Sequence, residues 1–196
     1  EESGLDFFSE TTDVLADAAY RKKSVEETAR IARYQYLFQV ANEVSADAVA
    51  VGHHADDQVE TILMNMLRGS SLAGLRGMGF LALPNAWSDT IPLVRPLLST
   101  WRDEIDNYIR EHDLATRMDS SNLDRTYYRN RLRHELIPYL ETYNPKIRKL
   151  IWQTGFTLQD DYDLVSDKIK QSWEYCVSEK QEAHIRFSLS RLRSQP

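Results

Sequence analysis

The segment "DAVAVG", residues 47–52, is an unbroken run dominated by small and β-branched residues. Such a strand, without polar alternation, is typical of a parallel sheet that is covered on both faces. The segment before it begins with Ser24 and Glu27 at capping-box spacing, which predicts the start of a helix. Strands that alternate with helices of this length predict βαβ units and a parallel sheet. The apolar positions at helical spacing are Ile31, Tyr34, Leu37, Phe38, Ala41 and Val44 before the run, and Val59, Ile62, Leu63, Met66 and Leu67 after it.

Other elements are predicted on both sides of this unit. Residues 5–10, "LDFFSE", suit a short strand, and residues 91–100, "IPLVRPLLST", suit an extended segment. Residues 100–114 predict a helix that Thr100 caps. A long amphipathic helix is expected from residue 144 onward, and residues 182–196 alternate like a strand that begins a further element.

Composition limits the class of protein. The 196 residues are 42% hydrophobic and 28% charged, which is typical of a globular protein. No stretch approaches the roughly 18 uninterrupted apolar residues that a membrane span needs, and the acidic start is unlike a signal peptide. Cys176 is the only cysteine, so we expect no internal disulfide, no cysteine-rich zinc site and a reducing cytoplasm. The net charge of −6 argues against general, non-specific nucleic-acid binding but leaves room for a local basic patch.

Two histidines and two aspartates, His53, His54, Asp56 and Asp57, lie between the predicted strand and the next helix. In parallel α/β sheets ligands bind beyond the carboxyl ends of the strands, which is where this group is expected. Helix capping would explain one aspartate, but two adjacent aspartates cannot hold the same cap position. Neighbouring histidines on an extended chain point to opposite sides and are poor joint ligands for one zinc ion. A hard cation such as Mg²⁺, held by an aspartate and a phosphate, is chemically easier.

Two later segments each allow two interpretations. Residues 67–79, "LRGSSLAGLRGMG", hold four glycines in 13 residues and predict either a flexible loop or a segment that follows a phosphate or nucleic-acid backbone. The Lys-Ser/Thr spacing of a Walker loop is missing from it. Residues 125–133 are either a nucleic-acid contact, through guanidinium groups and stacked tyrosines, or a solvated helix face paired with nearby carboxylates. This basic cluster consists of Arg125, Arg129, Arg131 and Arg133, interleaved with Tyr127, Tyr128 and Asn130.

Five motifs occur in an order and spacing that resemble a known family. They are "EETARIARYQYL", "GHHADDQVETILMNMLRGSSLAGLRGM", "VRPLL", "DSSN" and "YRNRLRHELIP". Together they resemble the N-terminal domain of the tRNA(Ile)-lysidine synthetase family, which belongs to the N-type ATP pyrophosphatases. The resemblance covers Leu5 to about Pro145. It implies an α/β fold, a partial doubly wound parallel sheet of the adenine-nucleotide α-hydrolase-like class, followed by a helical extension.

The resemblance also implies a reaction. In that family ATP adenylates the C2 carbonyl oxygen of the wobble cytidine of isoleucine tRNA, and pyrophosphate leaves. The amine of free lysine then attacks C2 and expels AMP, which forms lysidine. ATP and Mg²⁺ are the implied cofactors, isoleucine tRNA and free lysine are the implied partners, and we expect a homodimer and no membrane.

The resemblance assigns roles to individual residues. Arg33 would meet the ATP phosphates or the transition state, and Asp57 would bind Mg²⁺ or orient the lysine amine. His54 and Asp56 would support that site, and Asp56 would help to bind the cofactor. The tRNA or phosphate contacts would come from Arg129, Asn130, Arg131 and Arg133.

The family also opens with a Ser-Gly-Gly-x-Asp-Ser phosphate loop, which these 196 residues do not contain. We therefore expect residues 1–145 to be a partial pyrophosphatase domain that is inactive alone. Residues 146–196 are expected to be a helical linker and the start of a further domain. The alternatives are a non-catalytic tRNA-binding module and a related ATP-dependent tRNA-modifying enzyme such as a thiolase. A thiolase with a cluster or catalytic thiols needs several cysteines, against which the single Cys176 argues.

Overall fold

The computed structural model describes residues 4–116, 128–181 and 184–195, and the chain forms two compact units. The first unit consists of Glu1–His54 and Gly79–Ser99, and the second of Ala55–Met78 and Thr100–Pro196. Each unit is thus formed by two separate stretches of the chain. The boundary expected near residue 145 stays a prediction, since these units divide the chain elsewhere.

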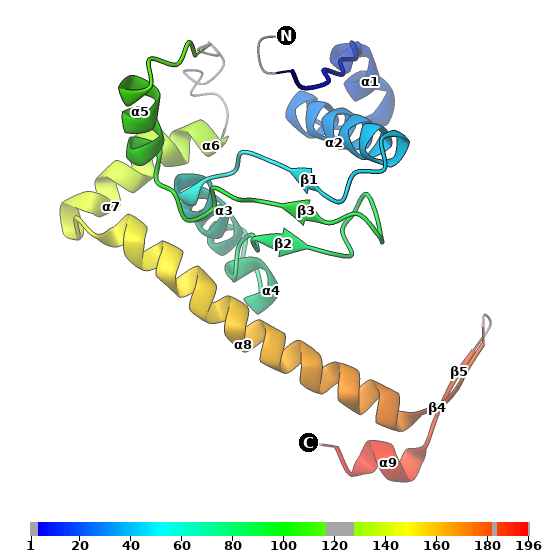
Figure 1. Cartoon of the computed structure of the whole chain (residues 1–196). Coiled ribbons are helices and arrows are strands. Elements are labelled where there is room, and N and C mark those ends of the chain that lie inside the picture. Colours follow the sequence, from blue (N-terminus) through cyan, green and yellow to red (C-terminus); the bar gives the residue numbers. More distant parts are fainter. Residues whose placement is uncertain (1–3, 117–127, 182–183, 196) are drawn as a thin grey trace. The chain divides into compact units, whose positions relative to one another are not determined.

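The first unit contains two helices and a three-stranded sheet, labelled in Figure 1. The sheet has the order β1-β3-β2, in which β1 and β3 are parallel and β2 and β3 are antiparallel. The parallel pair, with Val49 opposite Leu93, confirms a parallel strand within residues 47–52, but Ala50 is exposed, so within the described residues the expected cover on both faces is not seen. The bounds are α1 Val14–Arg21, α2 Val25–Glu43, β1 Val49–Ala50, β2 Leu81–Ala82 and β3 Leu93–Val94.

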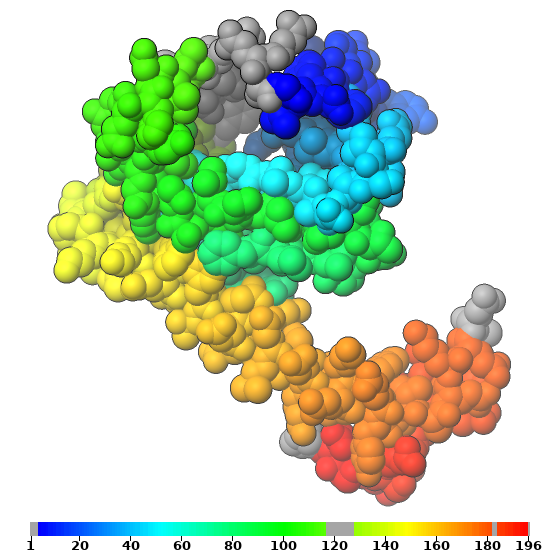
Figure 2. Space-filling view, viewed as in Figure 1, coloured from blue at the N-terminus to red at the C-terminus, as the bar shows by residue number. Residues whose placement is uncertain are grey.

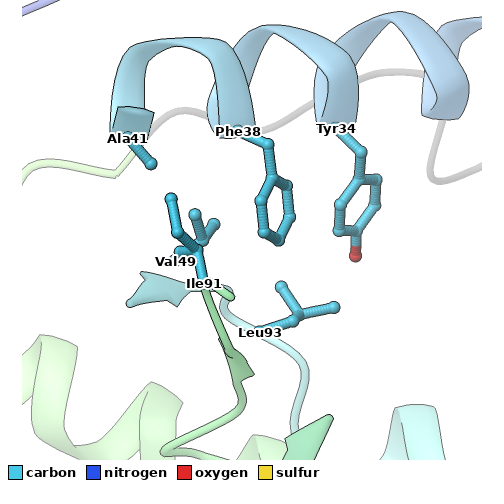
Figure 3. Close-up of a cluster of buried hydrophobic side chains, with 6 residues drawn as sticks. All are labelled: Tyr34, Phe38, Ala41, Val49, Ile91 and Leu93. Carbon is cyan, nitrogen blue, oxygen red and sulfur yellow. The ribbon is translucent and has the colours of Figure 1, made fainter. Parts of the chain in front are cut away.

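Helix α2 covers this sheet with the residues that the sequence pattern assigned to its core (Figure 3). Ser24 caps the helix, because its hydroxyl accepts the backbone N–H of Glu27 at 3.2 Å. Aromatic and small side chains at helical spacing then meet branched side chains of the sheet, and this packing removes apolar surface from water. The six buried residues are Tyr34, Phe38 and Ala41 of α2 with Val49, Ile91 and Leu93.

The strand predicted at residues 5–10 is wrong. Leu5 and Phe7 are 77% and 87% exposed, and in the described part of the chain no strand includes this segment. A strand is stable only when a neighbour pairs with its backbone N–H and C=O groups, and apolar content alone does not supply that neighbour. The short helix α1 nearby was not predicted, and Ala18 is its single buried residue.

The second unit is mainly helical. Its core joins Val59 and Leu63 of α3 to Leu132 and Ile137, with partly buried side chains from α7 and α8 around them. The long helix α8 confirms the amphipathic prediction. Of the strand-like residues 182–196, Ile185–Phe187 form a strand, but the prediction is wrong for Leu189–Arg193, which form helix α9. The bounds are α3 Ala55–Leu67, α4 Leu72–Leu75, α5 Arg102–Glu111, α6 Tyr128–Arg131, the π-helical turn η2 Leu132–Leu136, α7 Ile137–Tyr143, α8 Ile147–Cys176, β4 Val177–Lys180, β5 Ile185–Phe187 and α9 Leu189–Arg193.

The far end of α8 carries a small substructure of its own. Strands β4 and β5 form an antiparallel hairpin, and Figures 1 and 2 show the hairpin and α9 beside the C-terminal end of the helix. The backbone N–H of Ser188 binds the carbonyl oxygen of Cys176 at 2.9 Å, which ties the hairpin to that end. Within the residues that the structure describes, no helix is both long enough and apolar enough to cross a membrane.

Candidate functional site

The carboxylate motif lies where the sequence predicted it, between a strand and a helix. Strand β1 ends at Ala50 and α3 begins at Ala55, so Asp56 and Asp57 occupy the first turn of α3. Negative side chains are favoured there by the partial positive charge of the helix N-terminus. His53 and His54 precede the helix and are half-buried at the end of the first unit.

Asp56 connects three helices of the second unit. One carboxylate oxygen accepts the backbone N–H of Arg102, the first residue of α5, at 2.9 Å. The other oxygen lies 2.9 Å from Nη1 of Arg148 on α8, whose Nε in turn binds Glu141 at 2.7 Å. Burial lowers the pKa of Arg148, but hydrogen bonding and charge from Asp56 and Glu141 outweigh it and raise the pKa above its ordinary value.

The cap of α5 is therefore different from the one predicted. The N-cap residue is Trp101 rather than Thr100, and the carboxylate of Glu104 accepts the Trp101 N–H at 2.6 Å. Asp56 satisfies the next free N–H of α5 from 46 residues away. A long-range cap of this kind leaves no signal in the local sequence.

Asp57 and a third carboxylate, Glu60, face two arginines from the segment after α5. Arg129 reaches Asp57 Oδ1 through Nη2 at 3.0 Å and Glu60 Oε2 through Nε at 2.5 Å. Arg133 reaches Glu60 Oε1 through Nε at 2.6 Å and Asp57 Oδ1 through Nη2 at 3.6 Å. We call these four residues the carboxylate–arginine cluster.

The cluster is balanced in charge and centred on a buried group. The Glu60 side chain is 1% exposed, so its negative charge would be costly without both guanidinium partners. Burial lowers the pKa of Arg133, but its hydrogen bond to Glu60 and the charges of Glu60 and Asp57 raise it above its ordinary value. The side chains of Arg129 and Arg133 are still about one-third exposed, at 30% and 36%. The cluster thus leaves the edges of two fixed guanidinium groups, and a small part of Asp57, accessible to solvent.

A buried amide fixes the glycine-rich segment beside α3. Gln58 is fully buried, and its carboxamide accepts the Met78 N–H at 2.7 Å and donates to the carbonyl oxygens of Arg76 and Met78 at 3.3 and 3.0 Å. Gly77 has a φ of 69°, and a Cβ there would lie 2.6 Å from the Gln58 Oε1. Glycine is needed at this position for both reasons. The segment contains the four-residue helix α4, and Gln58 holds its C-terminal end; its interpretations as a flexible loop and as a nucleic-acid contact both stay predictions.

The remaining predicted site residues are dispersed. Arg33 is exposed on α2 of the first unit, and its role at the ATP phosphates or the transition state stays a prediction. Arg131 is 60% exposed and lies 3.5 Å from Glu135, while Asn130 is half-buried. Arg125, Tyr127 and the "DSSN" motif lie outside the described residues. Within the part of the chain that is described, no group of three or more histidine, cysteine or acidic side chains could hold a metal ion.

Sequence reasoning missed Gln58, Glu60 and Arg148. A partial signal existed, because Glu60 follows Asp57 by three residues and lies directly beside the apolar positions of α3. A charged residue at the edge of an apolar helix face indicates a buried partner, but its partners lie 69 and 73 residues away.

Known proteins resemble this chain in sequence and in fold. A family model described as a PP-loop domain matches residues 3–140. A tRNA(Ile)-lysidine synthase of Geobacter sulfurreducens is 37% identical over 98% of this chain and 40% of that protein. One of Clostridium tetani is 35% identical over 93% of this chain and 38% of that protein. The Bifunctional protein TilS/HprT of Listeria monocytogenes is 36% identical over 88% of this chain and 26% of that protein.

The chain therefore spans 40% or less of the length of these relatives. Among solved structures, the U34-tRNA thiolase NcsA from Methanococcus maripaludis has a TM-score of 0.53 and 21% identity. The match covers 67% of this chain and 43% of that one. This likeness concerns the fold alone, and it supports the predicted α/β class with a helical C-terminal region.

Proposed function

Since this chain belongs to the PP-loop domain family, we propose that it is part of an ATP-dependent ligase that joins lysine to the wobble cytidine of isoleucine tRNA. The match of residues 3–140, together with relatives named tRNA(Ile)-lysidine synthase at 35–37% identity, carries the proposal. The residues of the carboxylate–arginine cluster lie within or beside motifs on which the sequence resemblance depends.

The proposed reaction has two steps that balance. The C2 carbonyl oxygen of the cytidine attacks the α-phosphate of ATP, and pyrophosphate leaves. The lysine amine then attacks C2, loses a proton, and AMP leaves with the C2 oxygen. Negative charge develops on phosphate oxygens in both steps, so fixed arginines are suitable stabilisers.

We assign Asp57 to the lysine amine. Its side chain is 13% exposed and is held by Arg129, so the carboxylate is fixed in direction before a ligand arrives. A carboxylate in a partly covered position attracts an ammonium group and, once the amine is neutral, accepts its hydrogen bond. Arg33 remains a candidate for the ATP phosphates, and His54 and Asp56 for support of the site.

The described residues do not fit a magnesium site made by the protein. Both oxygens of Glu60 and Oδ1 of Asp57 already bind Arg129 and Arg133, so these two carboxylates do not supply the several oxygen ligands that a magnesium site made by the protein would need. Mg²⁺ at nucleotide sites takes few protein ligands and several phosphate or water oxygens. We therefore assign no step of the reaction to a metal held by these residues.

The same geometry changes the proposal for tRNA contacts. Arg129 and Arg133 both form ion pairs with the buried Glu60, whereas Arg131 is exposed and lies 3.5 Å from Glu135. We therefore propose Arg131 as the phosphate contact of this segment. Arg129 and Arg133 can act on a ligand only through the guanidinium edges that remain exposed.

The test is incorporation of labelled lysine into isoleucine tRNA by the whole protein with ATP. The proposal expects one AMP and one pyrophosphate for each lysine joined. Binding of tRNA without release of AMP or pyrophosphate would favour the non-catalytic module. Incorporation of sulfur in place of lysine would favour the thiolase.

A further inference from the structure

Two tyrosines on α7 form an exposed pair that lies outside the carboxylate–arginine cluster. The hydroxyl groups of Tyr139 and Tyr143 are 2.9 Å apart, and the ring centroids are 5.3 Å apart with the ring planes at 75°. The two residues are 58% and 74% exposed. In such an edge-to-face pair, the ring that presents its edge keeps its faces open for stacking.

The pair lies on the solvent side of a segment whose other side is core. Leu132 and Ile137 are buried against α3, and Leu136 and Leu140 pack with them. The exposed side shows Arg131 and Glu135, then Tyr139 and Tyr143, at intervals of four residues. Packing of the fold therefore does not require aromatic rings at the last two positions. Figure 2 shows α7 and the turn that follows it, in yellow, at the surface of the molecule.

Exposed cations lie close to the tyrosine pair in the sequence. Of the six arginines and lysines in residues 128–150, Arg129, Arg133 and Arg148 pair with carboxylates of α3, and the other three are exposed. Lys146 and Lys149 follow Tyr143 closely at the start of the 30-residue helix α8. The Asn144 side chain accepts the Lys146 N–H at 2.9 Å and fixes this turn. The positive end of a long helix and two ammonium groups favour a phosphate group nearby.

We propose that Tyr139 and Tyr143 form a stacking platform for an unpaired base of an RNA loop, with an adjacent phosphate near Lys146 and Lys149. Aromatic side chains stack on bases that are not paired, and cations beside them bind the backbone. The cations favour RNA over an apolar peptide as the occupant of this surface. The choice of RNA rests on the proposed function, whereas the location of the platform rests on the exposed rings and the charges around them.

The experiment measures binding of an anticodon stem-loop RNA to the whole protein. The probes are the intact stem-loop and versions in which one loop base at a time is replaced by an abasic site. The double variant Tyr139→Ala/Tyr143→Ala should bind the intact probe about tenfold more weakly, as expected for the loss of one stacked base. One abasic probe should bind the wild-type protein about tenfold more weakly than the intact probe does. The double variant should bind that abasic probe and the intact probe equally well.

Two controls separate stacking from other roles. Tyr139→Phe/Tyr143→Phe removes the hydroxyl pair but keeps the rings, and it should bind like wild type. Tyr20→Ala removes a tyrosine on α1 that is 88% exposed, and it should also leave binding unchanged. Circular dichroism and thermal melting show that each variant is folded.

Three results would overturn the platform. In the first, the double variant binds the intact probe like wild type. In the second, every abasic penalty is the same in wild type and in the double variant. In the third, the variant changes the oligomeric state but not RNA binding, which makes the surface a protein contact. Lysine incorporation by wild type tests the proposed function separately, so either proposal can fail while the other stands.

Discussion

The segment from Tyr128 to Tyr143 has two faces that use the same residue type differently. Arg129 and Arg133 turn toward α3, where they neutralise a glutamate that is 1% exposed. Arg131, two residues from each, is 60% exposed and lies 3.5 Å from Glu135, which is 48% exposed. The arginines that look like one basic patch in the sequence therefore lie on two faces, one with buried ion pairs and one exposed to solvent. The sequence shows how many arginines there are, but the direction of each side chain from the helix determines which of them are free to bind a ligand.

The largest effect should come from Glu60→Gln. This change keeps the shape of the side chain but leaves Arg129 and Arg133 without the buried charge that they neutralise. We expect a loss of about 3 kcal/mol in the free energy of unfolding, at the low end for a broken buried pair because both arginines reach solvent. Chemical denaturation of the two proteins measures it.

Glu135→Gln is the matched control on the solvent face. It removes the partner of Arg131 in an exposed pair, and it should cost less than about 1 kcal/mol. Equal losses for Glu60→Gln and Glu135→Gln would show that the two faces do not differ in the way described.

A smaller effect is expected when the shape of the cation changes but not its charge. Arg133→Lys keeps one positive charge but loses the planar group that reaches Glu60 through Nε and Asp57 through Nη2. We expect a loss of about 1.5 kcal/mol, the low end for a hydrogen bond to a charged group. Arg131→Lys should change the stability by no more than about 0.5 kcal/mol, as other exposed surface substitutions do. If both lysine variants melt like wild type, the fork geometry of Arg133 does not contribute.

The smallest effect on stability, and a specific effect on RNA binding, should come from Arg131→Ala. The free energy of unfolding should change by no more than about 0.5 kcal/mol, as is usual for an exposed residue. The slope of the logarithm of tRNA affinity against the logarithm of salt concentration should become shallower by about 1, since one phosphate contact is lost. An unchanged slope would show that Arg131 does not contact phosphate.

The sequence predicted those parts of the fold that depend on local patterns. Tyr34, Phe38 and Ala41 were placed in a core by helical spacing alone, and the strand at Val49 was recognised from its unbroken apolar run. The antiparallel strand β2 was not predicted, because two residues are too few to show alternation. The strand prediction for residues 5–10 failed for the opposite reason, because the apolar run is present but, in the described part of the chain, no neighbouring strand pairs with it.

The candidate site was predictable only as a group of residue types at the start of a helix. Helix capping was expected to explain one of the two aspartates, but Asp56 caps α5 rather than the helix that contains it. Glu60 and Gln58 depend on partners that only the folded chain brings near. Burial of a charged or amide group is decided by tertiary contacts, which a local spacing rule does not include.

The most direct test of the account is labelled-lysine incorporation into isoleucine tRNA by the whole protein that carries Asp57→Asn. Asparagine keeps an oxygen for Arg129 and a similar shape, and Glu60 still neutralises the arginines, so the melting temperature should change little. The lost negative charge should lower the rate of incorporation on the order of 10²-fold, as for a single electrostatic contact to a transition state. A folded variant with little incorporation is the predicted result. Near-normal incorporation with a lowered melting temperature would contradict the account, because Asp57 would then be a structural counter-ion and not a ligand for lysine.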